Sequence, residues 1–114
     1  MVVIDDHPVV RQGLRSLLSN YPDMTLVGEA GDAAAALDLV GRVLPDVILL
    51  DNRMPGETGV SVLPRLKQVA PNAKVLMLTS FDEDEYVTRA LQSGAHGYLL
   101  KNASDEMLAS AVRA

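Results

Sequence analysis

Short apolar runs alternate along the chain with longer segments in which apolar residues recur every three or four positions. Runs of the first kind predict β-strands, and segments of the second kind predict amphipathic helices. We expect five strands, at residues 1–4, 24–30, 47–50, 73–79 and 97–100. A regular alternation of strands and helices predicts an α/β domain built around a parallel sheet.

A helix is expected after each strand. The helices are predicted to begin at Asp6 or His7, after Asp32, at Gly59, at Asp84 and after Ser104. They are predicted to end before Pro22, before Pro45, at Val69, at Ser93 and at the last residue of the chain. The fifth pattern has no C-terminal stop signal, so we expect a helix cut short in a domain taken from a longer protein.

The apolar positions also predict how the elements pack. The inward faces of the second and third helices are predicted to comprise Ala33, Ala36, Leu37, Val40 and Leu44, and Val60, Leu63 and Leu66, respectively. Pro64 lies inside the third helix and removes a backbone hydrogen bond, so we expect a bend there. The strand at 47–50 is apolar throughout, which suits a sheet covered on both faces, whereas the less apolar strand at 24–30 suits an edge.

Composition narrows the class of protein. At 114 residues the chain is long enough for one domain with one core. It has no cysteine, which excludes disulfides and thiolate chemistry. No apolar run approaches the length of a membrane span and no signal-peptide pattern is present, so we expect a cytoplasmic protein. The net charge of −5 gives the domain no general attraction for nucleic acid.

Acidic residues follow two of the predicted strands. Asp51 comes directly after strand 47–50, and Asp5 and Asp6 come directly after strand 1–4. Because neighbouring strands of an open parallel sheet converge on one crevice, three carboxylates should share one site. Two unit charges about 4 Å apart repel by roughly 4 kcal/mol at an effective dielectric near 20, so the acids need a cation or raised pKa values. Mg²⁺ between Asp6, Asp51 and a carbonyl of the following loop is the simplest answer. The alternative is that Asp51 only caps a turn.

Two further polar residues end strands at the same predicted edge. Thr79 closes the strand at 73–79, and Lys101 follows the strand at 97–100. A lysine ammonium can pair with a carboxylate or with a phosphoryl oxygen, and a threonine hydroxyl can donate to another oxygen. Together they favour phosphoryl transfer to a nucleophilic Asp51.

Other polar residues are weaker candidates for a role in the site. We expect His7, which precedes Pro8, to serve the turn, with a role as ligand or proton carrier as the alternative. His96 is expected to be exposed in a turn, and the acidic run 82–85 to be solvated at a helix N-terminus. Tyr98 suits either the strand core or a side chain that moves when the site changes.

These residues resemble the receiver domain of bacterial two-component response regulators, and the resemblance covers residues 1–114. The matching positions are Asp5, Asp6, Asp51, Met54, Pro55, Gly59, Thr79 and Lys101. Segments 6–11, 52–56 and 95–101 are most similar to the NarL/FixJ (LuxR-type) group. The resemblance implies a flavodoxin-like, doubly wound sheet of five parallel strands in the order 2-1-3-4-5, with five helices.

The resemblance also implies a phosphoryl acceptor and a metal site. Asp51 would take a phosphoryl group from a sensor histidine kinase, with Mg²⁺ as cofactor. The ion would be held by Asp6, the Asp51 carboxylate and the backbone carbonyl of Arg53, and Asp5 would act through water. The protein would be a regulator rather than an enzyme, apart from its own phosphoryl transfer and autodephosphorylation.

A switch and an output are implied as well. Lys101 and Thr79 would hold the phosphoryl oxygens, and Thr79 and Tyr98 would move on phosphorylation. That movement would alter the surface of the fourth helix, fifth strand and fifth helix. Homodimers would form through that surface or through the first and fifth helices. A C-terminal helix-turn-helix domain in the parent protein would bind DNA.

Some positions depart from the family pattern. Asn102 stands where the family often has a proline after a cis bond, so the isomer of the Lys101–Asn102 bond is left open. Phe81 and Arg53 occupy positions that, in the family they resemble, control water access to the acyl phosphate, and we expect them to slow self-dephosphorylation.

Alternative functions have specific requirements. A phosphatase of the haloacid dehalogenase type needs a second Asp where Arg53 stands. A flavin- or dinucleotide-binding domain needs a glycine- or hydroxyl-rich loop after the first strand, where this chain has Asp5, Asp6, His7 and Pro8. A degenerate receiver that mediates only protein contacts is the remaining alternative.

Overall fold

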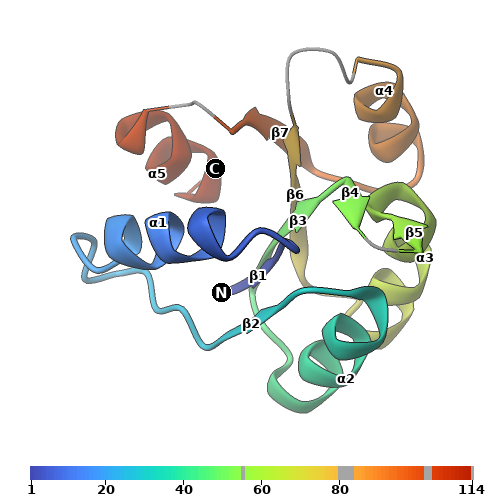
Figure 1. The fold of residues 1–114 in the computed structure, drawn as a ribbon, viewed down its shortest axis with the longest axis horizontal. Helices are drawn as coiled ribbons and strands as arrows, with labels where there is room; N and C mark the ends of the chain where they lie inside the picture. The colour runs from blue at the N-terminus through green and yellow to red at the C-terminus, as the bar shows by residue number, and fades with distance from the viewer. Residues whose placement is uncertain (55, 80–83, 102–103, 114) are drawn as a thin grey trace.

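The central sheet has five parallel strands in the order β2-β1-β3-β6-β7 (Figure 1). The computed structural model describes residues 1–54, 56–79, 84–101 and 104–113. The sheet strands are β1 (Val2–Ile4), β2 (Gly28–Ala30), β3 (Val47–Asp51), β6 (Lys74–Thr79) and β7 (Gly97–Leu100). Counted along the chain, these are strands 2-1-3-4-5, so the predicted flavodoxin-like order is confirmed.

Helices cover both faces of this sheet. They are α1 (Pro8–Leu18), α2 (Ala33–Val43), α3 (Gly59–Val69), α4 (Asp84–Gln92) and α5 (Asp105–Arg113). Figure 1 shows α1 and α5 on one side of the sheet and α2, α3 and α4 on the other. Side chains of a strand point alternately to its two faces. Val3, Leu49 and Leu76 therefore pack with α1 and α5, whereas Ile4, Leu50 and Met77 pack with α2 and α3.

Local signals explain where several helices begin. The Asp32 side chain accepts the Ala35 N–H at 2.8 Å and caps α2, and Thr58 accepts the Ser61 N–H at 3.2 Å and caps α3. At the start of α1, His7 is extended because it precedes Pro8, and its side chain makes no cap hydrogen bond.

The second strand is shorter than predicted. Residues 24–30 were expected to form it, but only Gly28–Ala30 pair as a strand, each opposite one residue of β1. Met1 makes two hydrogen bonds to the residues before β2: its carbonyl accepts the Val27 N–H at 2.8 Å, and its amino group donates to the Thr25 carbonyl at 2.9 Å. The strand pairing itself begins at Val2 and Gly28, although Met24 is still buried in the core.

Two helix faces also differ from expectation. Leu44 was predicted to face inward, but it is 62% exposed and its φ of 45° places it in the left-handed turn that ends α2. The inward face of α3 includes Val62, which the sequence pattern did not assign to it, together with the predicted Leu63 and Leu66. Pro64 is accommodated on the exposed side of α3, and the helix continues through it.

A short hairpin that was not predicted lies between β3 and α3. Its strands are β4 (Arg53–Met54) and β5 (Glu57–Thr58), paired antiparallel. Two-residue strands are too short to produce a periodic pattern, so the sequence offers no signal for them. The hairpin carries the chain from the end of the central strand to the start of α3.

Candidate functional site

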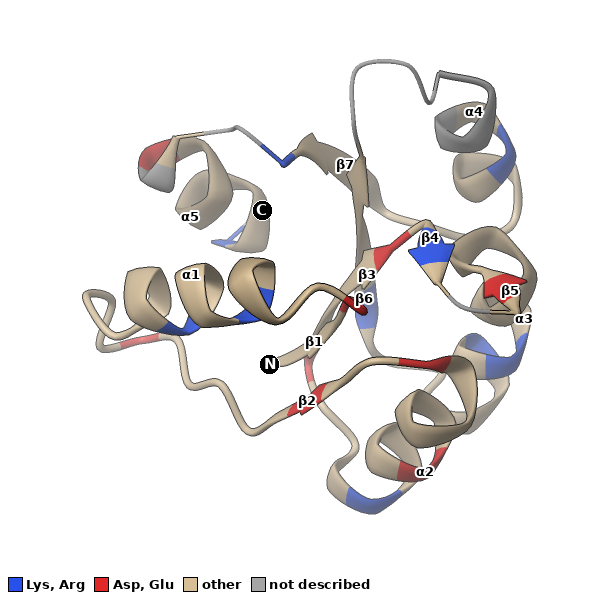
Figure 2. Ribbon diagram, in the orientation of Figure 1, with Lys and Arg blue, Asp and Glu red and all other residues tan. Residues whose placement is uncertain are grey.

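The parallel register brings four strand ends to one edge of the sheet. Asp51 is the last residue of β3, and Asp5 follows Ile4, which pairs with Leu50. Thr79 is the last residue of β6, and Lys101 directly follows β7, with its N–H donating to the Thr79 carbonyl at 2.8 Å. In Figure 2 acidic segments mark the ends of β1 and β3, and a basic segment follows β7.

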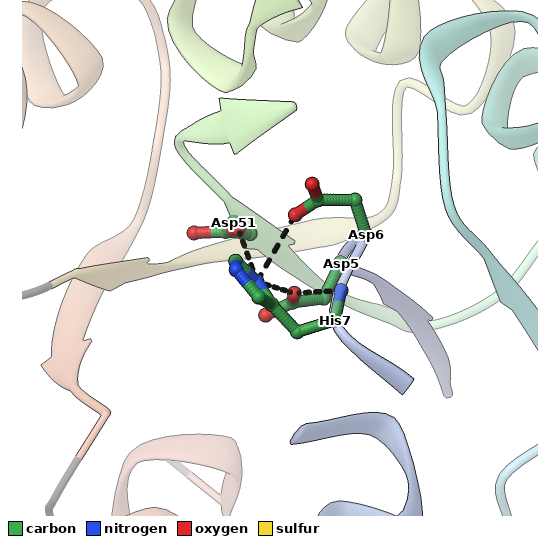
Figure 3. A group of neighbouring side chains, drawn as sticks. All are labelled: Asp5, Asp6, His7 and Asp51. Carbon is green, nitrogen blue, oxygen red and sulfur yellow. Dashed lines mark hydrogen bonds and ion pairs between the residues drawn. The ribbon is translucent and has the colours of Figure 1, made fainter. Parts of the chain in front are cut away.

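Three carboxylates converge at this edge, as predicted. Asp5 and Asp51 are fully buried, and the side chain of Asp6 is 29% exposed. One ligand atom from each of Asp5, Asp6, His7 and Asp51 lies within 4.8 Å of the others, and Figure 3 shows the four side chains pointing toward a common centre. The chain therefore has an acidic cluster capable of binding a metal ion.

His7 joins this cluster rather than serving the turn alone. Its Nδ1 atom lies 2.9 Å from Asp5 Oδ1, 3.0 Å from Asp6 Oδ1 and 3.9 Å from Asp51 Oδ2 (Figure 3). Its backbone N–H also donates to Asp5 Oδ1 at 2.8 Å. The expectation that His7 mainly serves the turn was therefore incomplete. Its position beside two aspartates was the available signal.

Lys101 provides the positive charge next to Asp51. Its Nζ atom lies 3.0 Å from Asp51 Oδ1 and 3.6 Å from Asp5 Oδ2. Burial acts to lower the pKa of Lys101, but the close contact and charge of Asp51, together with the charge of Asp5, outweigh it, and the pKa is raised. The ammonium therefore stays charged and holds the resting carboxylate.

Asp51 is in an unfavourable place for a negative charge. Burial raises its pKa from 3.8 to about 6, and the charge of Asp5 adds to this effect. The nearby Lys101 ammonium and the backbone of Arg53 act in the opposite direction. One ammonium thus compensates only part of the charge of the buried acids.

Several buried polar atoms of the site lack a hydrogen bond within the part of the chain that the structure describes. They are Asp5 Oδ2, Asp6 Oδ1, both carboxylate oxygens of Asp51, Asn52 Nδ2 and Thr79 Oγ1. Asp51 Oδ1 nevertheless forms an ion pair with Lys101 Nζ at 3.0 Å. An ammonium at this distance stabilises the carboxylate electrostatically even without ideal hydrogen-bond geometry. Buried carboxylate oxygens with spare acceptor capacity are what a hard divalent cation requires, so the donor set fits Mg²⁺.

Gly59 allows the loop after Asp51 to fold back on the strand end. Its N–H donates to the Asn52 carbonyl at 2.7 Å. A Cβ at this position would lie 2.4 Å from the Asp51 carbonyl oxygen, closer than such atoms can approach. The close approach of the Asp51 backbone therefore requires glycine at this position.

Arg11 supports the site from outside, a contact that sequence reasoning missed. Its guanidinium donates to the Asp5 carbonyl and pairs with Glu29 at 3.4 Å. Arg15 contacts the other oxygen of Glu29 at 3.2 Å. A charged residue one helical turn beyond His7 was the only signal, and it does not specify a partner.

The remaining predictions have mixed outcomes. Tyr98 is 51% exposed, so it is not a core residue, and its role as a switch stays a prediction. His96 is exposed as expected, but its Nδ1 accepts the Val75 N–H at 3.2 Å. Pro55, Phe81, Asn102 and residues 82–83 lie outside the described residues, and so does the Lys101–Asn102 bond. No helix in the described ranges is long and apolar enough to cross a membrane.

The fold and the strand-end residues define a signalling receiver domain, and the comparisons agree. Residues 1–113 match the model of the response regulator receiver domain, and the chain belongs to this family. It is of the NarL/FixJ type. Its similarity to the receiver domain of NarL from Mycobacterium tuberculosis has a TM-score of 0.86 at 40% identity, covering 98% of this chain and 94% of that one.

Two longer proteins are also similar. The chain is 44% identical to the oxygen regulatory protein NreC of Staphylococcus epidermidis over 99% of its own length and 52% of that protein. It is 41% identical to the transcriptional regulatory protein YxjL of Bacillus subtilis over 100% of its length and 52% of that protein. The chain therefore spans about half the length of these relatives.

Proposed function

We propose that Asp51 accepts a phosphoryl group from a sensor histidine kinase and that the modified domain passes a signal to an output domain. The observation that carries the proposal is a buried Asp51 carboxylate 3.0 Å from the Lys101 ammonium and next to the Asp5, Asp6 and His7 cluster. A nucleophile, a counter-charge and a cation site are the parts that phosphoryl transfer requires.

In the proposed reaction an oxygen of the Asp51 carboxylate attacks the phosphorus of the phosphohistidine. The new O–P bond forms as the P–N bond breaks, and the bonding electron pair leaves with the imidazole nitrogen. Bound Mg²⁺ would supply positive charge to the phosphoryl oxygens. Asp6, Asp51 and the Arg53 carbonyl are proposed to hold the ion directly, with Asp5 acting through water.

Lys101 and Thr79 are proposed to hold the product. The Lys101 ammonium would exchange its contact with the resting carboxylate for a phosphoryl oxygen. The Thr79 hydroxyl is buried without a hydrogen bond in the described part of the chain, so it has a donor free for another phosphoryl oxygen. Movement of Thr79 and of the half-exposed Tyr98 is the proposed switch.

Incubation with acetyl phosphate and MgCl₂, followed by mass spectrometry, tests the acceptor. The wild-type chain should gain one phosphoryl group, and Asp51→Asn should gain none. Asp46→Asn is the matched control, because Asp46 is exposed and precedes the same strand at its other end, so it should label like wild type. Equal labelling of wild type and Asp51→Asn would reject Asp51 as acceptor. An unlabelled wild type would favour the degenerate receiver.

The proposed output lies beyond this chain. The relatives are about twice as long, and one is called a transcriptional regulatory protein, which supports a C-terminal DNA-binding domain in the parent protein. Homodimer formation through α4, β7 and α5, or through α1 and α5, is part of the proposal. Gel filtration of phosphorylated and unphosphorylated protein checks whether the state of Asp51 controls it.

We also propose that the acyl phosphate is long-lived. Arg53 and Phe81 are bulky side chains at positions expected to limit water access to Asp51. Phosphoryl half-lives of Arg53→Asn and Phe81→Ala should be shorter than that of wild type. Unchanged decay in both variants would remove this idea.

A further inference from the structure

The imidazole of His7 occupies a position suited to a metal ligand. Ligand atoms at right angles around an ion, each about 2.1 Å from it, lie about 3.0 Å apart, and opposite ligands lie about 4.2 Å apart. His7 Nδ1 is 3.0 Å from Asp6 Oδ1, which matches adjacent ligands, and 2.9 Å from Asp5 Oδ1, with which it is within hydrogen-bond distance. Its 3.9 Å separation from Asp51 Oδ2 falls between the two values.

The placement of His7 is built into the chain. Pro8 restricts the His7 backbone to extended conformations, and the observed φ of −94° and ψ of 109° lie in that region. The His7 N–H is tied to Asp5 Oδ1 at 2.8 Å. The ring is therefore anchored at the end of β1 and directed into the acids, while 55% of the side chain stays exposed to solvent.

Two further observations indicate that a cation is needed at this point. Asp51 Oδ2 and Asp5 Oδ2 are fully buried and have no hydrogen bond from the residues that the structure describes. Lys101 is the nearest ammonium, and its Nζ contacts Asp51 Oδ1 and lies 3.6 Å from Asp5 Oδ2. Asp51 Oδ2 faces His7 instead.

We propose that His7 is a nitrogen ligand of this site and that it extends the site's preference from Mg²⁺ to borderline divalent cations such as Zn²⁺ and Co²⁺. This inference rests on the proposed cation binding by the acids. Carboxylates and water suit Mg²⁺, whereas imidazole suits zinc and the later transition metals, whose affinities for a mixed site exceed that of Mg²⁺. An imidazole that binds only the latter group therefore shifts selectivity without removing the Mg²⁺ site.

The opposing interpretation is that His7 only pairs with the acids. In that case the imidazole competes with every bound cation. Replacing it would then strengthen Mg²⁺ and Zn²⁺ binding together. The ligand role predicts the opposite for Zn²⁺ and little change for Mg²⁺, so the two interpretations differ in sign.

Isothermal titration with MgCl₂ and ZnCl₂ at pH 7.5 separates them, using untagged wild type, His7→Asn and His96→Asn. The chain has two histidines and no cysteine, and His96 lies at the other end of the sheet, which makes His96→Asn the matched control. His7→Asn should weaken Zn²⁺ binding by at least about tenfold and change the Mg²⁺ Kd by less than about twofold. The control should match wild type for both ions.

A measurement on the wild type guards against a variant that fails to fold. In ¹⁵N spectra of the imidazoles, ZnCl₂ should change the chemical shift of His7 Nδ1 and leave the shifts of His96 unchanged. MgCl₂ should produce no change of similar size in either histidine. Equal Zn²⁺ affinity in wild type and His7→Asn, or no Zn²⁺-specific shift of His7, would overturn the proposal. Failure of the proposed function has a different signature, since wild type would then bind no Mg²⁺ and gain no phosphoryl group from acetyl phosphate.

Discussion

The ionised carboxylate of Asp51 destabilises the folded protein. Its carboxylate is buried and close to Asp5, and the contact with Lys101 compensates only in part, which is why its pKa is raised to about 6. The native state therefore binds this proton at a higher pH than the unfolded chain, whose value is near 3.8. This linkage gives stability that is present at low pH and lost as pH rises through about 6.

Asp51→Asn removes this cost. In EDTA at pH 7.5 the variant should be more stable than wild type by about 1–2 kcal/mol, after allowance for solvent screening and for the lost contact with Lys101. The difference should shrink toward pH 5, where wild-type Asp51 becomes protonated. Urea unfolding at both pH values measures it, and a less stable Asp51→Asn at pH 7.5 would contradict the assignment.

The elements next to the site carry their own backbone constraints. The loop from Asp51 through the β4–β5 hairpin to α3 returns to the strand end because Gly59 lacks a side chain. Helix α2 ends in Leu44, a left-handed residue with an exposed side chain. A glycine is thus needed at one junction, and a residue other than glycine is tolerated at the other.

Gly59→Ala should damage both the fold and the site. The added Cβ would collide with the Asp51 carbonyl, so we expect a loss of about 1–3 kcal/mol in the free energy of unfolding and slower labelling by acetyl phosphate. Gly41→Ala is the control, because it lies within α2 and its Cβ would meet only Val69 at an ordinary 3.5 Å. Gly41→Ala should leave the free energy of unfolding unchanged or raise it by up to about 1 kcal/mol. Equal effects of Gly41→Ala and Gly59→Ala would count against a collision between the added Cβ and the Asp51 carbonyl.

Leu44→Gly should stabilise the end of α2. A left-handed conformation costs an ordinary residue about 1–2 kcal/mol, and the exposed leucine recovers little by burial. We expect a gain of about 0.5–1 kcal/mol over wild type in thermal or urea unfolding. Leu44→Ala keeps the strained backbone, so a gain of the same size in that variant would assign the effect to the side chain instead.

Sequence reasoning succeeded or failed for identifiable physical reasons. Apolar runs predicted β3 and β6 because buried central strands have a strong pattern. The prediction placed the start of the second strand too early, because β1 begins at Val2 opposite Gly28 and only Met1 lies beside residues 25 and 27. The acidic convergence followed from parallel topology, whereas the orientation of His7 depends on a rotamer that only the assembled site determines.

For the whole molecule, a cation bound at the acidic cluster would couple to global stability. A ligand that binds only the folded protein stabilises it by about 1.4 kcal/mol when its concentration is tenfold above Kd. MgCl₂ should therefore raise the urea midpoint of wild type and of Asp46→Asn, and raise that of Asp51→Asn much less. Equal stabilisation of all three would place the bound ion elsewhere.

The topology of the sheet has a consequence for folding. Asp5, Asp51, Thr79 and Lys101 each come from a different βα unit, and Lys101 reaches the site only after the last crossover has placed β7 beside β6. A chain still emerging from the ribosome, or one in which β7 has detached, lacks the ammonium beside Asp51. Under the proposed function, competence for phosphorylation would therefore belong to the finished domain alone, and incomplete copies would not respond to the signal.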